Sequence, residues 1–326
     1  MIWRSAFALA SPGGRGARLS ILIFHRVLAA PDALFPEEPD AAQFAALMAH
    51  VAARFRVLPL ADAIDALRRG TLPSRALAIT FDDGYADNLS VALPILQRHH
   101  VPATVFVATG YLDGGAMWND LVIEALRKTA RDALDLATIG LGRVALDSTV
   151  ARRRAIDAVL GHLKYLPQGE RESHARRTLE LAAVDPPQGL MLTRQGLAAL
   201  DAAGIGIGAH TVTHPILARL DSDAARREIT ASKHDLEAML GKPIRLFAYP
   251  NGKPARDYTP EHVRMVAAAG FTAAVSTAPG VARRDADVHQ LPRFTPWSRK
   301  PLRFDLMMLR NLRQRGAPIA SAAMSA

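Results

Sequence analysis

The 326-residue sequence contains no cysteine. Disulfide bonds and cysteine-based zinc sites are therefore excluded, and any metal ion must be bound by histidine, aspartate or glutamate. No apolar run reaches the roughly 18 residues that a membrane-spanning helix needs, and the run at residues 6–10 is short for a signal-peptide core. We therefore expect no cleaved signal, and a protein that is cytoplasmic or peripherally bound at a membrane.

The sequence also lacks a long basic run, although its formal net charge is +9. The cations are dispersed in short groups such as Arg152-Arg153-Arg154, and no basic patch with interleaved aromatic residues is present. A dedicated nucleic-acid module is therefore not expected, whereas attraction to an anionic membrane surface or an acidic polymer is compatible with this charge. Nothing in the sequence indicates an oligomeric state.

Apolar runs and amphipathic segments alternate along the chain. The amphipathic segments predict helices, for example residues 40–53 with Asp40 as the N-cap. This alternation predicts an α/β fold built on a parallel sheet or barrel. The expected strands are residues 19–24, 77–81, 101–107, 205–209, 244–248, 271–276 and 288–291.

Three segments lie outside this regular pattern. Residues 1–18 read as a loose lead-in. Residues 111–190 contain helical patterns interrupted by glycine and proline, and they are too long for a simple connection, so we expect an inserted helical cap. In the final segment, residues 301–326, a basic amphipathic helix over 302–312 is expected before a disordered Ala/Ser-rich tail.

Polar residues with catalytic potential follow the ends of five different expected strands. In parallel α/β barrels the carboxyl ends of the strands form the edge at which chemistry collects. Gly84 after the aspartate pair permits a tight turn, so both carboxylates can face one cavity. The residues concerned are His25, Asp82, Asp83, His210, Asn251 and Arg293.

The spacing of His210 and His214 is that of two ligands for one metal ion. Pro215 and the intervening Thr-Val-Thr favour a turn rather than a helix. Two imidazoles and one carboxylate suit Zn²⁺ and leave a coordination position open for water. The alternative is a solvated Asp-Gly turn and two surface histidines, but the presence of both patterns at strand ends favours the metal site.

The segments Thr80-Phe-Asp-Asp-Gly84 and His210-Thr-Val-Thr-His214 together resemble the first two motifs of the polysaccharide deacetylases, the NodB-like carbohydrate esterases. This resemblance implies a distorted (β/α) barrel of about seven parallel strands, here over residues 19–300 with an inserted cap at about 111–190. It also implies a hydrolase that uses one divalent metal ion, Zn²⁺ or another, to remove N- or O-acetyl groups from sugar polymers.

The motifs can be carried over residue by residue. The resemblance implies that Asp83, His210 and His214 bind the metal ion and that Asp82 is the general base. The third family motif, Arg-x-Pro-Tyr, corresponds to residues 248–251. The backbone N–H at its last position, here that of Asn251, is implied to stabilise the oxyanion.

Two family residues are missing at their usual places. The motif arginine that orients the base is replaced by Ala248, and we expect Arg293 to take over its role. The late Leu-x-x-His that supplies the general acid is not recognisable, since His289 has the wrong offset. Phe24-His25 resembles the early Tyr-His of a family subgroup, so His25 is the expected general acid.

Three aromatic residues, Tyr85, Trp118 and Tyr249, are candidates for stacking on sugar rings, although packing is an equally common role for aromatic side chains. The expected function is metal-dependent removal of N-acetyl groups from a saccharide in cell-envelope or exopolysaccharide synthesis. Two alternatives stay open: hydrolysis of a non-sugar amide or cyclic imide at the same site, and an inactive carbohydrate-binding protein.

Overall fold

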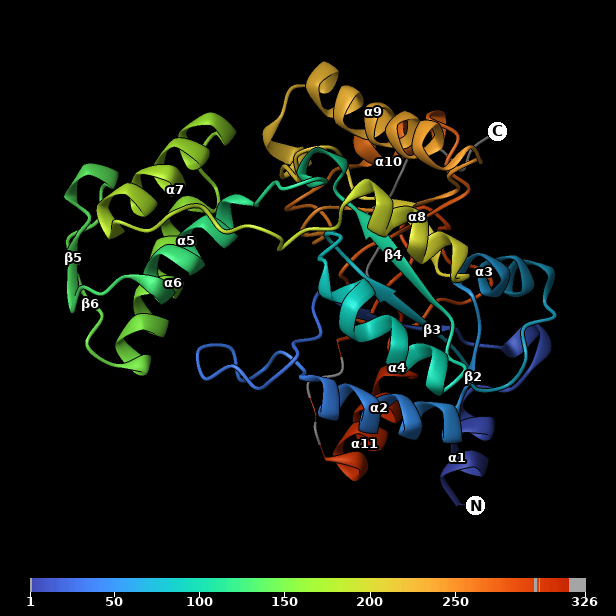
Figure 1. Cartoon of the computed structure of the whole chain (residues 1–326). Helices are drawn as coiled ribbons and strands as arrows, with labels where there is room; N and C mark the ends of the chain where they lie inside the picture. The colour runs from blue at the N-terminus through green and yellow to red at the C-terminus, as the bar shows by residue number, and fades with distance from the viewer. Residues whose placement is uncertain (1, 296–297, 299, 317–326) are drawn as a thin grey trace.

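The computed structural model describes residues 2–295, 298 and 300–316, and its centre is a parallel sheet (Figure 1). Its seven strands are ordered β1-β3-β4-β7-β8-β9, with β2 also paired to β3. All of these pairs are parallel, so the predicted α/β class is confirmed. The strands are β1 (Ser20–Phe24), β2 (Arg56–Val57), β3 (Ala76–Phe81), β4 (Ala103–Val107), β7 (Gly206–Ala209), β8 (Leu246–Ala248) and β9 (Ala273–Val275).

The segment after β9 joins the two edges of this sheet. The expected strand at residues 288–291 is not a strand; instead Leu291 forms a single bridge to Val275 and Phe294 one to Leu22. The N–H of Phe294 donates to the Ile21 carbonyl at 2.8 Å, beside β1. This segment therefore closes the sheet into the expected distorted barrel and carries Arg293 to its interior.

Alternate residues of each strand face the barrel interior or the surrounding helices, as the two-residue period of a strand requires. On β3, Ala78 packs in the interior cluster with Phe106, whereas Leu77 and Ile79 pack in the cluster under the helices. The interior is so tight that a Cβ on Gly208 would lie 2.5 Å from the Phe106 ring. A side chain at this position of β7 would therefore clash with the ring.

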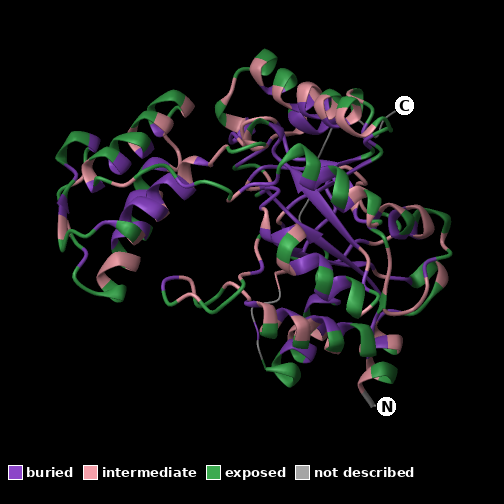
Figure 2. Ribbon diagram, viewed as in Figure 1, coloured by how far each residue is buried: buried purple, intermediate pink, exposed green. Residues whose placement is uncertain are grey.

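Helices cover the outside of the barrel, with their exposed faces turned to solvent (Figure 2). Asp40, Thr193 and Asp221 cap three of these helices through their side chains, as expected for Asp40. The helical segment that follows β3 begins as a π-helical turn, Asn88–Ala92. The helices are α2 (Ala41–Arg54), α3 (Leu60–Arg69), α4 (Leu93–Arg98), α8 (Arg194–Ala202), α9 (Ser222–Leu240) and α10 (Pro260–Ala268).

A helical lobe stands apart from the barrel, at the left of Figure 1. It has a hydrophobic core of its own, built around residues such as Val122, Ile156 and Leu179. A short antiparallel hairpin follows its first helix. The elements of the lobe are α5 (Trp118–Lys128), β5 (Ala133–Asp135), β6 (Arg143–Ala145), α6 (Thr149–Leu163) and α7 (Gln168–Ala182).

The N-terminal segment is not the loose lead-in that the sequence indicated. It forms helix α1 (Ile2–Ala10), because Phe7 is fully buried with its ring 4.5 Å from that of Phe55. Helix α11 (Pro301–Asn311) matches the expected amphipathic helix and contacts α1. The tail expected to be disordered, residues 317–326, lies outside the described part of the chain. Within the described part, no helix is long and apolar enough to cross a membrane.

Candidate active site

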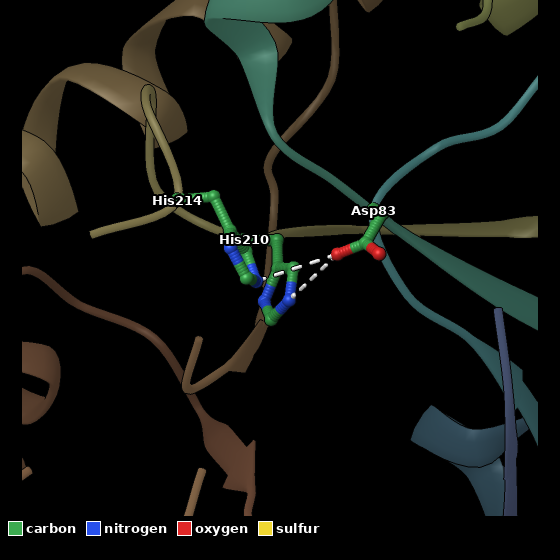
Figure 3. A group of neighbouring side chains, drawn as sticks. All are labelled: Asp83, His210 and His214. Atoms are coloured by element: carbon green, nitrogen blue, oxygen red, sulfur yellow. Dashed lines mark ion pairs between the residues drawn. The ribbon is translucent and has the colours of Figure 1, made fainter. Parts of the chain in front are cut away.

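Asp83, His210 and His214 converge at the carboxyl ends of β3 and β7 (Figure 3). The Oδ1 atom of Asp83 lies 3.5 Å from Nε2 of His210 and 3.4 Å from Nε2 of His214. One ligand atom from each of the three residues lies within 4.8 Å of the others. The structure thus brings together the three residues that the sequence predicted as metal ligands.

The backbone at these positions takes a conformation that most residues avoid. Asp83, His214 and Asn251 have positive φ angles of 75°, 52° and 58°, in the left-handed region. Such strain of roughly 1–3 kcal/mol per residue persists only where the surrounding structure enforces it. Around His214 that support comes from Glu228 on α9, which accepts the N–H groups of Val212 and Thr213 at 2.8 and 2.9 Å.

The donor atoms fit a divalent metal ion. Nδ1 of His210 lies 2.7 Å from the Ala248 carbonyl, to which it donates, so Nε2 is the ring nitrogen that faces Asp83 and could bind a metal ion. Oδ1 of Asp83 is buried and accepts no hydrogen bond from the described residues. Four ligands placed tetrahedrally about 2.0 Å from a zinc ion are about 3.3 Å apart, which is close to the separations of 3.5 and 3.4 Å between Asp83 and the two rings. A Zn²⁺ ion therefore fits between these three side chains.

The ionisation of this triad also suits a metal ion. Burial would raise the pKa of Asp83, but the adjacent His214 and His210 outweigh burial and hold that pKa below its ordinary value. Burial lowers the pKa of His214 to about 4. Burial would lower the pKa of His210, but the charge of Asp82 and the contact with Asp83 outweigh burial and raise that pKa, so a metal ion would displace a proton from this ring. Asp83 offers an ionised carboxylate and His214 a neutral imidazole, which are the forms that bind metal ions.

Asp82 forms a buried bidentate ion pair with Arg293. Nη1 and Nη2 of Arg293 lie 2.6 and 2.7 Å from the two carboxylate oxygens, and the guanidinium also donates to the Ser276 carbonyl at 2.9 Å. Burial would raise the pKa of Asp82, but the charges of Arg293 and His210 outweigh burial and hold the pKa below its usual value. Arg293 therefore contacts Asp82 as expected and keeps it ionised.

His25 and Asn251 lie on the wall of the same cavity, whose volume is about 420 Å³. His25 follows β1 and is exposed. Its loop is held by Asn88, whose amide donates to the His25 carbonyl at 2.9 Å, and by Asp87, which accepts from Arg26 at 2.7 Å. The backbone N–H of Asn251 has no acceptor within the described residues. Both groups are thus available to a ligand in the cavity.

Comparison with known proteins agrees with this geometry. Residues 69–136 and 168–274, more than half of the chain, match the family model described as polysaccharide deacetylase. The chain belongs to the polysaccharide deacetylase family. It is accordingly a hydrolase that acts on the C–N bond of N-acetyl groups. YxkH of Bacillus subtilis (strain 168), whose name places it among the polysaccharide deacetylases, is 22% identical over 278 residues, which is 85% of this chain and 71% of the relative.

Solved structures of deacetylases share the fold of this deacetylase. PplD, a deacetylase of Streptococcus pyogenes solved in complex with acetate, has a TM-score of 0.60 at 18% identity and covers 91% of this chain and 99% of its own. IcaB of Ammonifex degensii has a TM-score of 0.59 at 17% identity, with coverages of 93% and 99%. These likenesses confirm the predicted distorted barrel.

The structure separates the three aromatic residues that the sequence offered for sugar stacking. Tyr249 is fully buried, with its ring stacked 3.9 Å from that of Tyr258, so it packs the core and does not form part of the mouth. Tyr85 and Trp118 do line the cavity of the deacetylase. The hydroxyl of Tyr85 donates to Asp120 at 3.0 Å, so one edge of its ring is fixed.

Several residues that shape the site were not found by sequence reasoning. Glu228 lies in the middle of a long helix, and only its contact with the His210–His214 turn reveals its role. Asp87 follows the aspartate motif by a few residues and supports the His25 loop by accepting the Val27 N–H. Its position in the sequence does not indicate this role. Arg171 lies in the inserted segment, for which the family motifs provide no guidance.

Proposed function

We propose that this deacetylase removes N-acetyl groups from a saccharide or polysaccharide by a metal-dependent mechanism, in the synthesis of a cell-envelope polysaccharide or exopolysaccharide. The observation that carries the proposal is the meeting of two units at one edge of the barrel. One is the Asp83–His210–His214 triad, and the other is the Asp82–Arg293 pair, whose nearer oxygen lies 3.9 Å from His210 Nε2. The acetate bound in the related PplD is consistent with an acetyl substrate.

Each residue has a distinct task in this proposal. A divalent ion such as Zn²⁺, held by the triad, supplies polarisation of the acetyl carbonyl and a lower pKa of the attacking water. Asp82 accepts the proton of that water, and Arg293 holds the carboxylate in place. The free N–H of Asn251 donates to the oxyanion. His25 protonates the amine as the C–N bond breaks.

The pairing of Asp82 with Arg293 favours this function over an inactive carbohydrate-binding protein. In this chain the motif arginine is absent at Ala248, which on its own would leave the base without a partner. Arg293, from the segment that closes the barrel, restores a bidentate contact to both oxygens of Asp82. Because the desolvation cost of a buried ion pair can exceed the attraction between its charges, stability alone does not account for this pair, which favours a catalytic role.

The test is acetate release from N-acetylated oligosaccharides by the purified protein. We expect release to stop after treatment with a chelator and to return when Zn²⁺ or another divalent ion is added. Turnover of small amides or cyclic imides without turnover of saccharides would favour the alternative hydrolase. Saccharide binding with no metal-restored turnover of any of these substrates would contradict the proposed activity.

Peripheral association with a membrane is a further part of the proposal. Helices α1 and α11 contact one another, and Leu9, Leu302 and Leu306 on them are 84%, 60% and 55% exposed. Arg303 and Arg310 are exposed on α11 as well. Exposed leucines beside arginines suit the surface of an anionic bilayer. Sedimentation with vesicles tests this: binding to phosphatidylserine vesicles that persists in a Leu302→Ser/Leu306→Ser variant would contradict it.

A further inference from the structure

The helical lobe presents a buried cation to the active-site cavity. Arg171, on α7, is 3% exposed and lines the cavity together with His214. Its Nε and Nη2 atoms are buried and find no hydrogen-bond acceptor among the described residues. The guanidinium lies 5.1 Å from the centre of the Trp118 ring, a contact that orients the charge without neutralising it. A buried guanidinium without an acceptor is costly, so this position calls for an anionic partner.

A second cation, Lys164, lies on the same wall. It is half-buried just after α6, and it lines the cavity with Arg171. Burial lowers the pKa of the Lys164 ammonium, and the nearby cations Lys253 and Arg256 add to this effect, against the opposing charge of Asp257. Lys164 and Arg171 also line a smaller cavity at the junction of lobe and barrel, together with Arg219. Positive charge therefore continues from the cavity along this junction.

The acids of the cavity are engaged elsewhere. Asp32 lies 2.7 Å from Arg127, which also bonds Glu124 at 2.9 Å. Asp120 accepts the hydroxyl of Tyr85. Asp83 faces His210 and His214, and no ion pair joins Glu38 to Arg171 among the described residues. The described acids that line this cavity thus leave the guanidinium of Arg171 without a carboxylate partner.

We propose that Arg171 and Lys164 form a subsite for a negatively charged group of the substrate, a carboxylate or a phosphate, so that the preferred substrate is an anionic saccharide. This inference rests on the proposed function, because it places the anionic group in the cavity that holds the acetamido group. A guanidinium binds either oxyanion through two parallel hydrogen bonds, and the ammonium adds a third donor. The cavity volume of about 420 Å³ is suited to a small ligand of this kind.

The test measures binding by calorimetry with sugars that carry no acetyl group, so that turnover does not interfere. Methyl β-D-glucuronide is compared with methyl β-D-glucoside, and glucose 6-phosphate with glucose. We expect at least one anionic probe to bind about tenfold or more tightly than its neutral partner. The pair that shows the preference identifies carboxylate or phosphate as the recognised group. Equal affinity within both pairs would overturn the proposal.

Variants test whether Arg171 causes the preference for anionic sugars. In Arg171→Gln the preference should disappear while the neutral probes bind as before, and the exposed Arg176→Gln on the same helix should match the wild type. An anion preference that survives Arg171→Gln reports direct binding of the anion at the metal site and overturns the proposal. If Arg171→Gln does not fold, Lys164→Gln is used, for which we expect a partial loss; an unchanged preference there also counts against the subsite.

The outcomes separate this inference from the proposed function. An anion preference that depends on Arg171, in a protein that releases no acetate from any saccharide, would support the subsite and contradict the deacetylase assignment. Equal acetate release from neutral and anionic N-acetylated oligosaccharides, without a binding preference, would support the deacetylase and remove the subsite. The binding preference and the release of acetate are thus measured independently.

Discussion

Two charged groups beside the active-site cavity, one on the barrel and one on the lobe, differ in whether they are paired. On the barrel wall, Asp82 is paired with Arg293 through two hydrogen bonds, and Asp83 faces two imidazoles. On the lobe wall, Arg171 is buried with two nitrogen atoms that lack an acceptor among the described residues. A paired carboxylate is oriented and starts the reaction ionised, as a general base or metal ligand must, whereas an unpaired charge is available to a ligand. The barrel wall therefore suits catalysis, and the lobe wall suits recognition.

The largest effect that this contrast predicts is that of Asp82→Asn. An amide cannot accept the proton of water, so we expect turnover to fall by about 10²- to 10⁴-fold, the usual range for a general base. The metal content should stay unchanged, because Asp83, His210 and His214 remain. The measurements are acetate release and metal analysis of the same sample.

Stability provides an independent check on the Asp82 variant. The substitution leaves the Arg293 guanidinium buried without its carboxylate, which costs about 3–5 kcal/mol in comparable pairs. We expect a lower free energy of unfolding in urea, and rates must be measured at a temperature where the variant is folded. The exposed Asp147→Asn, in the lobe, is the matched control and should change neither quantity. A folded Asp82→Asn protein with near wild-type turnover would show that another group is the base.

A smaller and substrate-dependent effect is expected for His25→Ala. An amine leaving group must be protonated, whereas the alcohol of an activated ester leaves without this help. Hydrolysis of N-acetyl substrates should therefore fall by about 10²-fold or more, and hydrolysis of an activated acetyl ester by far less. His289→Ala is the control, because that ring bonds the Phe271 carbonyl and does not line the cavity. Equal losses for amide and ester would remove His25 as the general acid.

The difference between the two walls also explains what the sequence could reveal. The barrel edge was predictable for two reasons. The two-residue period of a strand puts Asp82 on the same face as Ala78, which packs in the barrel interior. Short motifs such as Asp-Asp-Gly also lie within one segment of the chain. The contact of Arg293 with Asp82 was expected in outline, although the connecting segment is a pair of bridges and not a strand.

The lobe wall was not predictable in the same way. Arg171 lies on an inserted helix whose sequence is dominated by charged residues, and the burial of one arginine there depends on packing against Trp118, 53 positions earlier in the chain, and on the docking of the lobe. For Tyr249 the error is the opposite one. The sequence indicated a residue that could contact sugar, but its ring is stacked on that of Tyr258 and buried. Tertiary packing of distant segments decides both cases, and local patterns do not report it.

The smallest expected effect concerns Asp120, the acid at which the two walls meet. It is 4% exposed, and burial raises its pKa to about 7, with the charge of Asp83 adding to the shift and the hydroxyl of Tyr85 and the charge of Arg26 opposing it. Between its unfolded pKa of about 3.9 and about 7, the folded protein binds more protons at this group than the unfolded chain does. The free energy of unfolding should therefore fall as the pH rises through this window, by up to roughly 4 kcal/mol from this group.

Asp120→Asn should remove this slope. The variant loses one of the two acceptors that serve Tyr85 and the Met117 N–H, so it should be less stable than the wild type near pH 4.5 by about 1–3 kcal/mol. Because it carries no titrating group, its disadvantage should shrink or reverse near pH 8. Urea unfolding of chelator-treated protein at several pH values measures this, with Asp147→Asn as the control that keeps the wild-type slope. Parallel pH profiles for wild type and Asp120→Asn would mean that Asp120 is already ionised in the folded protein. The lobe would then contribute an ionised carboxylate to the cavity, as the barrel does with Asp83.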